Sequence, residues 1–202
     1  MTLVLRRHPV QEGSIVAVNE GSDRRGRGPA DPARAARIAE AACAVVAQRG
    51  VGGVTHRAVA AAAGVPLGST TYHFATLDDL LAVALASAAE QNIARLRRWE
   101  RSLTAGTGLA AALADLVLRE VATNRAQTVV EYELYVAALH RPRLRQASTA
   151  WDNAMVEIFA SRTDLVTGRL LAATFCRLVL QALLAEHPPT RQDVEAIFRR
   201  AL

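Results

Sequence analysis

The sequence has no lysine and little cysteine. All 24 basic residues are arginines, a bias that we attribute to a GC-rich genome. The two cysteines, Cys43 and Cys176, lie far apart in apolar stretches, and no Cys/His cluster has the spacing of a metal site. We therefore expect no metal and no cofactor, and two small buried thiols in a reducing compartment.

Long apolar runs and alternating strand patterns are also lacking. We find no apolar run of the roughly 18 residues that span a bilayer and no signal peptide, which predicts a cytoplasmic protein without a membrane partner. Aromatic residues make up only 4% of the chain, and β-branched residues never gather in alternating runs. Since 51% of the residues are hydrophobic and alanine and leucine dominate, the sequence predicts an all-α fold with a sizeable core.

The excess of positive charge lies in the first third of the chain. Residues 1–75 hold nine arginines against five acidic residues, whereas residues 76–202 hold fifteen against fourteen. Residues 1–30 show no helical period and carry Arg24, Arg25 and Arg27 among glycines, which predicts a flexible arm. The arm is interpreted either as a phosphate-binding segment or as an idle, solvated tail.

Helix-start and helix-stop signals divide the rest of the chain into nine helices and no strand. Asp31 and Pro32 begin the first helix, and Gly50 ends it. Thr76 and Asp79 predict a capping box at the start of a long helix of about seven turns. The expected helices are 32–49, two short helices within 55–74, one from 76 to about 105, and then 108–123, 126–140, 142–162, 166–186 and 191–201.

Residues 55–74 carry the pattern of a helix-turn-helix. Thr55 is placed to cap a short helix, Gly64 permits a left-handed turn, and Pro66 can begin a second helix. The second helix is rich in hydroxyl side chains, which reach phosphate oxygens and base edges from the major groove. It is interpreted as a DNA-recognition helix or, alternatively, as a surface helix of a bundle.

The segment Gly64-Val-Pro-Leu-Gly-Ser-Thr-Thr-Tyr-His-Phe74, with Thr55-x-Arg57 before it and Leu80 after it, resembles the TetR family of transcriptional regulators. The family signature reads Gly-Val-Ser-x-Gly-Thr-Leu-Tyr-x-His-Phe, and the similarity extends over residues 33 to about 85. It implies a DNA-binding domain at 31–76, after the arm at 1–30, and a helical ligand-binding and dimerisation domain at 77–202. The DNA contacts implied by the resemblance are Thr55, Arg57, Gly68, Ser69, Thr71, Tyr72 and His73.

Three positions depart from the family pattern. Pro66 stands where a capping serine is usual, so the turn loses one side-chain partner. Thr71 replaces the usual tyrosine, and Tyr72 beside it is a candidate substitute. Leu77 replaces a common lysine, so one phosphate contact is expected to be missing.

The resemblance also implies a ligand pocket among the later helices, and no catalytic motif competes with it. Residues 106–111 match a dinucleotide fingerprint but follow no strand, and zinc-protease, di-iron and nucleophile-elbow motifs are missing, so we expect no enzyme. Glu131, Glu133 and Asp152, in otherwise apolar helices, hint at a cationic or amine-bearing ligand if any of them is buried, because a buried carboxylate needs a partner. The candidate ligand contacts, each alternatively plain core or surface, are Trp99, Glu131, Tyr132, Tyr135, Trp151, Asp152, Met155 and Phe175.

The helix expected at 166–186 is apolar almost all round, which indicates either the centre of the core or a self-association surface. The resemblance favours a homodimer through the last two helices. The candidate contacts are Leu171, Phe175, Leu178, Val194, Ile197 and Phe198.

These features predict a homodimeric repressor that binds a palindromic operator of double-stranded DNA. A small-molecule effector would release it by changing the spacing of two recognition helices about 34 Å apart. Activation in place of repression is left open. The alternative from another class is a helical carrier or adaptor that binds an apolar molecule without DNA.

Overall fold

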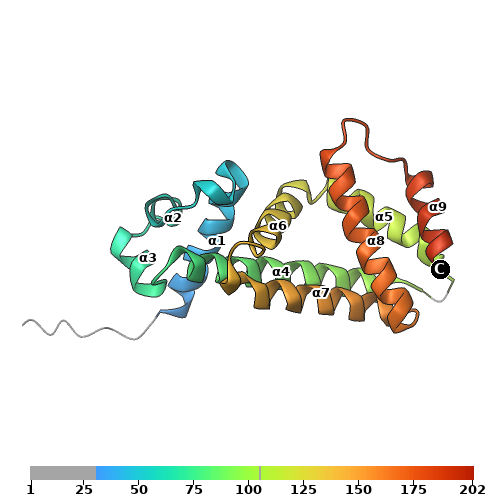
Figure 1. The fold of residues 1–202 in the computed structure, drawn as a ribbon, viewed down its shortest axis with the longest axis horizontal. Helices are drawn as coiled ribbons and strands as arrows, with labels where there is room; N and C mark the ends of the chain where they lie inside the picture. Colours follow the sequence, from blue (N-terminus) through green and yellow to red (C-terminus); the bar gives the residue numbers. More distant parts are fainter. Residues whose placement is uncertain (1–30, 105) are drawn as a thin grey trace, which may run out of the picture. The chain divides into compact units, whose positions relative to one another are not determined.

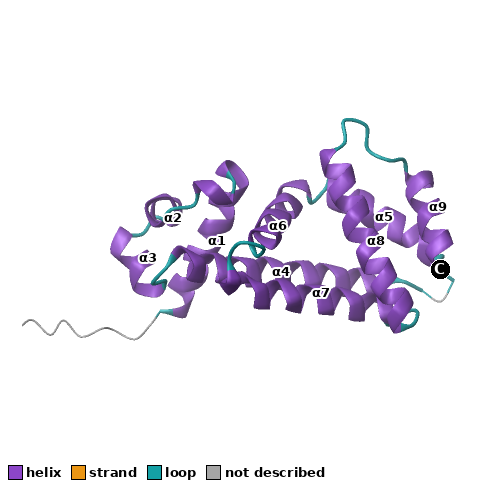
Figure 2. Cartoon of the chain, viewed as in Figure 1, coloured by secondary structure: helices purple, strands orange, loops and turns teal. Residues whose placement is uncertain are grey.

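The computed structural model describes residues 31–104 and 106–202, and every regular element in these ranges is a helix (Figures 1 and 2). The all-α prediction is thus confirmed, whereas the expected arm at 1–30 lies outside the described residues. The elements are α1 (Pro32–Arg49), η1 (Val51–Gly53), α2 (His56–Ala63), α3 (Leu67–His73), α4 (Leu77–Ser102), α5 (Leu109–Ala122), α6 (Arg125–Ala137), η2 (Pro142–Leu144), α7 (Arg145–Ala160), α8 (Leu165–Leu184) and α9 (Arg191–Ala201).

Side-chain caps fix the starts of several helices. The Asp31 carboxylate accepts the N–H of Arg34 at 3.1 Å at the start of α1, as the sequence predicts. Thr76 with Asp79, and Thr190 with Asp193, form complete capping boxes at α4 and α9. Local sequence therefore determines where these helices begin.

Several boundaries differ from the prediction. Helix α4 ends at Ser102, and beyond it the Thr104 N–H donates to the Thr107 hydroxyl at 3.0 Å. The segment expected as one helix at 142–162 is the short 3₁₀ turn η2 followed by α7.

One hydrophobic core runs through the described residues. In the helix-turn-helix, α1 packs on α2 and α4 and buries Ile38, Val45, Val59 and Phe74. Farther along the chain, α7 packs on α4 and α8, and α5 packs on α9. Helix α4 therefore belongs to both groups of helices and runs between them (Figure 1).

Helix α8 corrects one expectation from the sequence. By length and composition alone, α8 is long and apolar enough to cross a membrane. Only 39% of its most apolar 18-residue stretch is buried inside the chain. Such a helix is weak evidence for a membrane protein, since core helices of soluble proteins have the same composition.

The start of α8 is closely packed against α7, because a Cβ at Gly168 would lie 2.6 Å from the Ala160 nitrogen.

Candidate functional site

Helices α2 and α3 form a helix-turn-helix whose turn depends on a left-handed residue. Gly64 has φ 64° and ψ 36°, and the Val65 N–H donates to the Ala60 carbonyl at 3.0 Å across the turn. Thr55 caps α2 by accepting the Ala58 N–H at 3.0 Å. Helix α3 starts after Pro66 without a side-chain cap, as expected from the proline at that position.

Helix α3 has one buried and one open side. Thr70 is buried and its hydroxyl donates to the Leu67 carbonyl at 2.8 Å, while Phe74, just after the helix, is only 5% exposed. On the open side, Gly68, Thr71 and Tyr72 are exposed, and no atom lies within 4 Å of a Cβ built at Gly68. A flat surface can therefore approach this side of α3.

The predicted DNA contacts fall into two groups by exposure. Thr55, Arg57, Gly68, Thr71 and Tyr72 are exposed, whereas Ser69 and His73 are half-buried. The His73 ring meets the Tyr72 ring edge-on at 5.1 Å. Five of the seven residues are therefore exposed, although the Thr55 hydroxyl caps α2 and the Thr71 hydroxyl donates to the Gly68 carbonyl at 3.3 Å.

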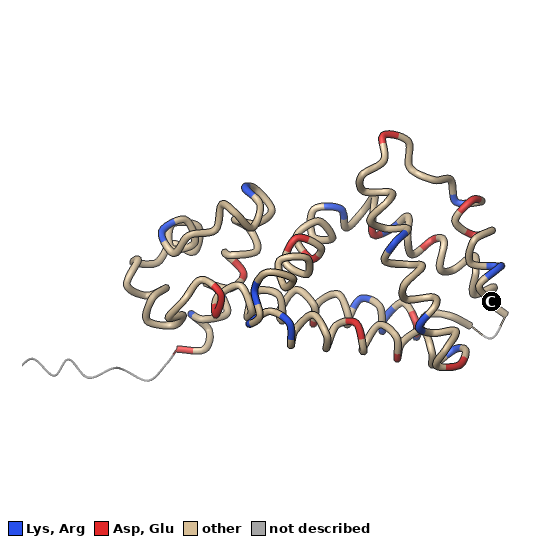
Figure 3. The backbone as a smooth tube through the Cα atoms, in the orientation of Figure 1, with Lys and Arg blue, Asp and Glu red and all other residues tan. Residues whose placement is uncertain are grey.

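Positive charge near α3 comes from α1 and α2. Figure 3 marks arginines on these two helices, and α3 itself carries none. A groove between α1 and α2 is lined in part by Arg49, Thr55 and Arg57. The exposed side of α3 is therefore polar but uncharged, with basic groups on the neighbouring helices.

A separate cavity of about 70 Å³ lies among α6, α7 and α8. Tyr135 stands edge-on to Trp151 at 5.6 Å and donates its hydroxyl proton to Asp152 at 2.9 Å. Desolvation raises the pKa of Asp152, and burial together with this hydrogen bond raises the pKa of Tyr135 to about 12. The lining residues are Tyr132, Tyr135, Trp151, Asp152, Met155 and Cys176, so five of the eight predicted ligand contacts are brought together.

The cavity is also lined by Cys176, which the sequence predicts as a small buried thiol and not as a ligand contact. The Cys176 Sγ lies 3.5 Å from the Met155 Sδ, and burial raises the pKa of the Cys176 thiol to about 11. The Tyr132 hydroxyl donates to the Cys176 carbonyl at 3.0 Å. Nothing in the helical spacing distinguishes this cysteine from an ordinary core residue.

Two predicted ligand contacts lie elsewhere, in an aromatic cluster of the core. Trp99 meets Phe159 edge-on at 5.9 Å, and Phe159 meets Phe175 at 5.7 Å. Trp99 is 6% exposed and Phe175 is 3% exposed, and neither lines the cavity. The structure places both as packing residues.

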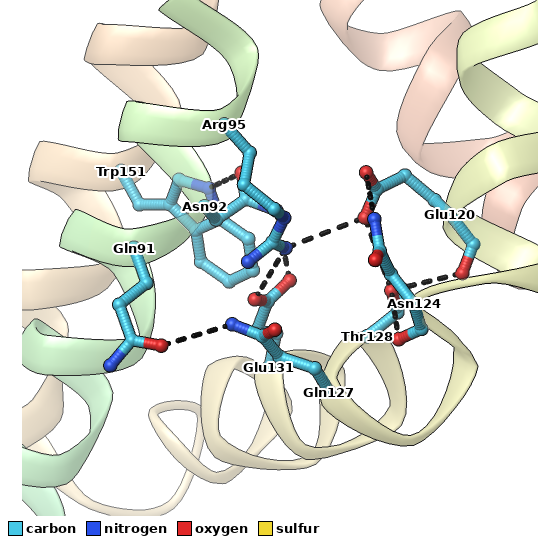
Figure 4. Close-up of polar contacts among 9 residues, drawn as sticks. All are labelled: Gln91, Asn92, Arg95, Glu120, Asn124, Gln127, Thr128, Glu131 and Trp151. Atoms are coloured by element: carbon cyan, nitrogen blue, oxygen red, sulfur yellow. Dashed lines mark hydrogen bonds and ion pairs between the residues drawn. The ribbon is translucent and has the colours of Figure 1, made fainter. Parts of the chain in front are cut away.

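Glu131, the remaining candidate, belongs to a buried polar network behind the cavity wall (Figure 4). Its carboxylate accepts one hydrogen bond from Arg95 Nη2 at 2.8 Å and one from Asn92 Nδ2 at 2.8 Å. Asn92 in turn accepts the indole N–H of Trp151 at 3.1 Å. The network therefore connects α4, α6 and a side chain that lines the cavity.

A second carboxylate shares the same guanidinium. Glu120 on α5 lies 3.4 Å from Arg95 Nη2 and accepts the Asn124 amide at 2.9 Å. Glu120 is 3% exposed and Glu131 is 0% exposed, so two buried carboxylates depend on one cation. Burial raises the pKa of Glu131 to about 7, although Arg95 and Asn92 act to lower it.

The predicted dimer contacts mostly face the core of their own chain. Ile197 is 42% exposed, and the other five lie between 0% and 5%. The exposed apolar residues of α8 and α9 are Leu165, Val166, Leu170, Leu184 and Ile197. This second set, and not the predicted one apart from Ile197, is open to solvent in the folded chain.

Comparison with known proteins identifies both parts of the chain. Residues 38–84 match the family model for bacterial regulatory proteins of the tetR family, and residues 104–202 match a tetracyclin repressor-like C-terminal domain. No protein with a curated description matches. Among solved structures, the multidrug binding protein EbrR in complex with imidazole is 42% identical over 85% of this chain and 96% of EbrR, with a TM-score of 0.77.

Further solved structures agree with this result. EbrR in complex with ethidium is 40% identical over 84% of this chain and 98% of that one, with a TM-score of 0.75. A TetR family member of Streptomyces coelicolor A3, SCO1917, is 41% identical over 84% of this chain and 98% of its own, with a TM-score of 0.73. EbrR has also been crystallised with proflavin and with malachite green.

Proposed function

This chain belongs to the TetR family of bacterial transcriptional regulators, and we propose that it is a homodimeric repressor that an aromatic cation releases from its operator. In this proposal, residues 31–76 bind double-stranded DNA, and residues 77–202 bind the effector and the second copy. The members of the family are regulators and not enzymes, and a DNA-binding regulator of a bacterium works in the cytoplasm.

The observation that carries the proposal is the open, polar side of α3. Gly68 permits close backbone approach, and the exposed Thr71 hydroxyl, which donates to the Gly68 carbonyl at 3.3 Å, can exchange this bond for one to a phosphate or base-edge acceptor in the major groove. Tyr72 is exposed beside it. Arg57, exposed on α2, supplies charge for the DNA backbone. Half-buried Ser69 and His73 would then serve mainly to hold the helix in place.

A gel-shift titration with the DNA flanking the protein's own gene tests this function. We expect a discrete band that survives an excess of random duplex, and Thr71→Ala should weaken the specific complex about tenfold. Thr123→Ala, which removes an exposed hydroxyl from the end of α5, is the matched control and should bind like wild type. If no specific band forms with that DNA or with operators selected from random sequence, the carrier alternative gains support.

The aromatic cavity supports a cationic, aromatic effector. Tyr132, Tyr135 and Trp151 present ring faces and edges, and Asp152 adds a carboxylate beside them. Ethidium, proflavin and malachite green, which are bound in EbrR structures, are all aromatic cations. The volume of about 70 Å³ is well below the roughly 300 Å³ of a typical ligand pocket, so the effector has to move the cavity walls.

Tetraphenylphosphonium is a suitable probe, because it is an aromatic cation that does not intercalate into DNA. We expect it to quench Trp151 fluorescence and to weaken the DNA complex. Asp152→Asn should lower its affinity by up to about fivefold, since a partly exposed ion pair contributes at most about 1 kcal/mol. Glu157→Gln, on the exposed side of the same helix, is the control, and equal affinities for the two variants would exclude Asp152 from cation binding.

For the dimer, we propose the exposed apolar side of α8 and α9 as the contact surface. Leu170 is 50% exposed and Leu184 is 78% exposed, and a second copy would remove both from water. Sedimentation equilibrium should give a dimer for wild type and a weaker dimer for Leu170→Glu.

A further inference from the structure

We propose that Glu133 is a positioning residue for DNA binding, whose carboxylate fastens helix α6 to the turn that follows α1. The inference rests on the proposed function, but it concerns a residue outside both the recognition helix and the cavity lining. It identifies one contact through which the ligand-binding helices hold the helix-turn-helix.

The contact joins a backbone amide of the turn to a side chain 82 residues away. The Val51 N–H donates to Glu133 Oε2 at 2.8 Å. Gly50, which ends α1 with φ +69°, passes so close that a Cβ there would lie 3.2 Å from the same oxygen. Glycine at this position therefore permits both the backbone angle and the approach of the carboxylate.

The same stretch of α6 also contributes residues to the cavity wall. Tyr132 and Tyr135 line it, and Glu131 holds Asn92 and Arg95 of α4. Because residues 131–135 lie within about one and a half turns of one helix, a shift of the cavity wall that displaces α6 also displaces Glu133. A rigid helix with two sides in different packing environments is the kind of element that can couple two sites.

Two other ion pairs, near the boundary between the two parts of the chain, reach a different place. Arg141 pairs with Asp78, and Arg143 lies 3.3 Å from Asp79, so both ion pairs hold the start of α4. Arg143 is largely exposed, and an exposed pair of this kind contributes little. Among the side-chain hydrogen bonds of the described residues, the Glu133 bond is the one that joins α6 to the turn between α1 and α2.

The test compares Glu133→Ala with Glu133→Gln in the full-length protein. The alanine removes the acceptor, whereas the glutamine keeps an oxygen that can accept the Val51 N–H. We expect Glu133→Ala to weaken binding to the operator duplex at least about fivefold and Glu133→Gln to stay within about twofold of wild type. Glu157→Ala removes an exposed carboxylate elsewhere and should bind like wild type.

Two further measurements separate positioning from a general loss of structure. Hydrogen exchange at residues 50–54 should be faster in Glu133→Ala and unchanged in the other two variants. The affinity of all three variants for tetraphenylphosphonium should stay within about twofold of wild type, since neither Glu133 nor Glu157 lines the cavity.

The outcomes distinguish this inference from the proposed function. If wild type binds its operator but Glu133→Ala binds equally well with unchanged exchange, Glu133 has no positioning role. A Glu133→Ala variant that loses probe binding as well would mean a folding defect and would also overturn the inference. If wild type binds no specific DNA, the proposed function fails, and the exchange comparison still decides whether Glu133 holds the turn.

Discussion

Replacing Glu131 with glutamine should change how the stability of the protein depends on pH. Glu131 is fully buried and shares Arg95 with Glu120, so the network holds two carboxylates and one guanidinium. Glutamine is close in size to glutamate and keeps an oxygen that can accept from Arg95. In the variant, one carboxylate and one guanidinium remain, and no buried group has to take up a proton.

The size of the effect follows from the pKa of Glu131. Burial raises this pKa from 4.5 to about 7, so the folded chain holds the proton more tightly than the unfolded chain does. The contribution to stability is therefore greatest below the unfolded pKa and is lost as the pH rises from about 4.5 to about 7. Between pH 5 and pH 8, wild type should lose about 2.5 kcal/mol through this group alone.

Urea unfolding of both proteins at several pH values measures this loss. The difference in free energy of unfolding should move by about 2.5 kcal/mol in favour of Glu131→Gln as the pH rises from 5 to 8. Protein concentration has to be equal throughout, because a dimer is more stable at higher concentration. Glu157→Gln, with an exposed carboxylate, is the control. Parallel pH profiles for wild type and Glu131→Gln would refute the reasoning.

Three other substitutions have expected outcomes that simple assays check. Gly168→Ala places a Cβ 2.6 Å from the Ala160 nitrogen and should destabilise the protein by about 1–3 kcal/mol or more in urea unfolding. Thr190→Ala removes one half of the α9 capping box and should cost about 1 kcal/mol, while an unchanged midpoint would mean that the cap is not needed. Arg57→Ala should reduce the slope of log K against log salt for DNA binding by about one, whereas Arg101→Ala on the far part of α4 should leave it unchanged.

The elements that the sequence predicts well are those that local chemistry determines. Asp31, Thr55, Thr76 and Thr190 cap helices within three or four residues of their own position, so no knowledge of the rest of the fold is needed. Helix α8 starts earlier than expected, because Asp164 caps it by accepting two N–H groups, a signal that is present in the sequence. The helix-turn-helix is recognisable for the same reason, since its turn lies within one short segment.

The parts that depend on tertiary contacts are predicted less well. The spacing of apolar residues places Asn92 on the buried side of α4, but only the fold brings it to Glu131 and Trp151. Periodicity also marks Leu171 and Phe198 as apolar without revealing that their own chain already covers them. Residues that face a second copy have the same composition as core residues, and exposure in the folded chain is what separates the two.

The small size of the cavity gives a physical reason for the preference for cations that we propose. A ligand larger than about 70 Å³ has to displace a wall, and Trp151 is held in that wall by its hydrogen bond to Asn92. Breaking this bond leaves a buried amide oxygen without a partner, which costs about 1–3 kcal/mol and lowers affinity by roughly 5- to 150-fold. A neutral aromatic ligand bears this cost without compensation. A cation can regain it above about pH 7, where Glu131 has lost its proton, because the network behind Trp151 then has two carboxylates for one guanidinium and attracts a second positive charge.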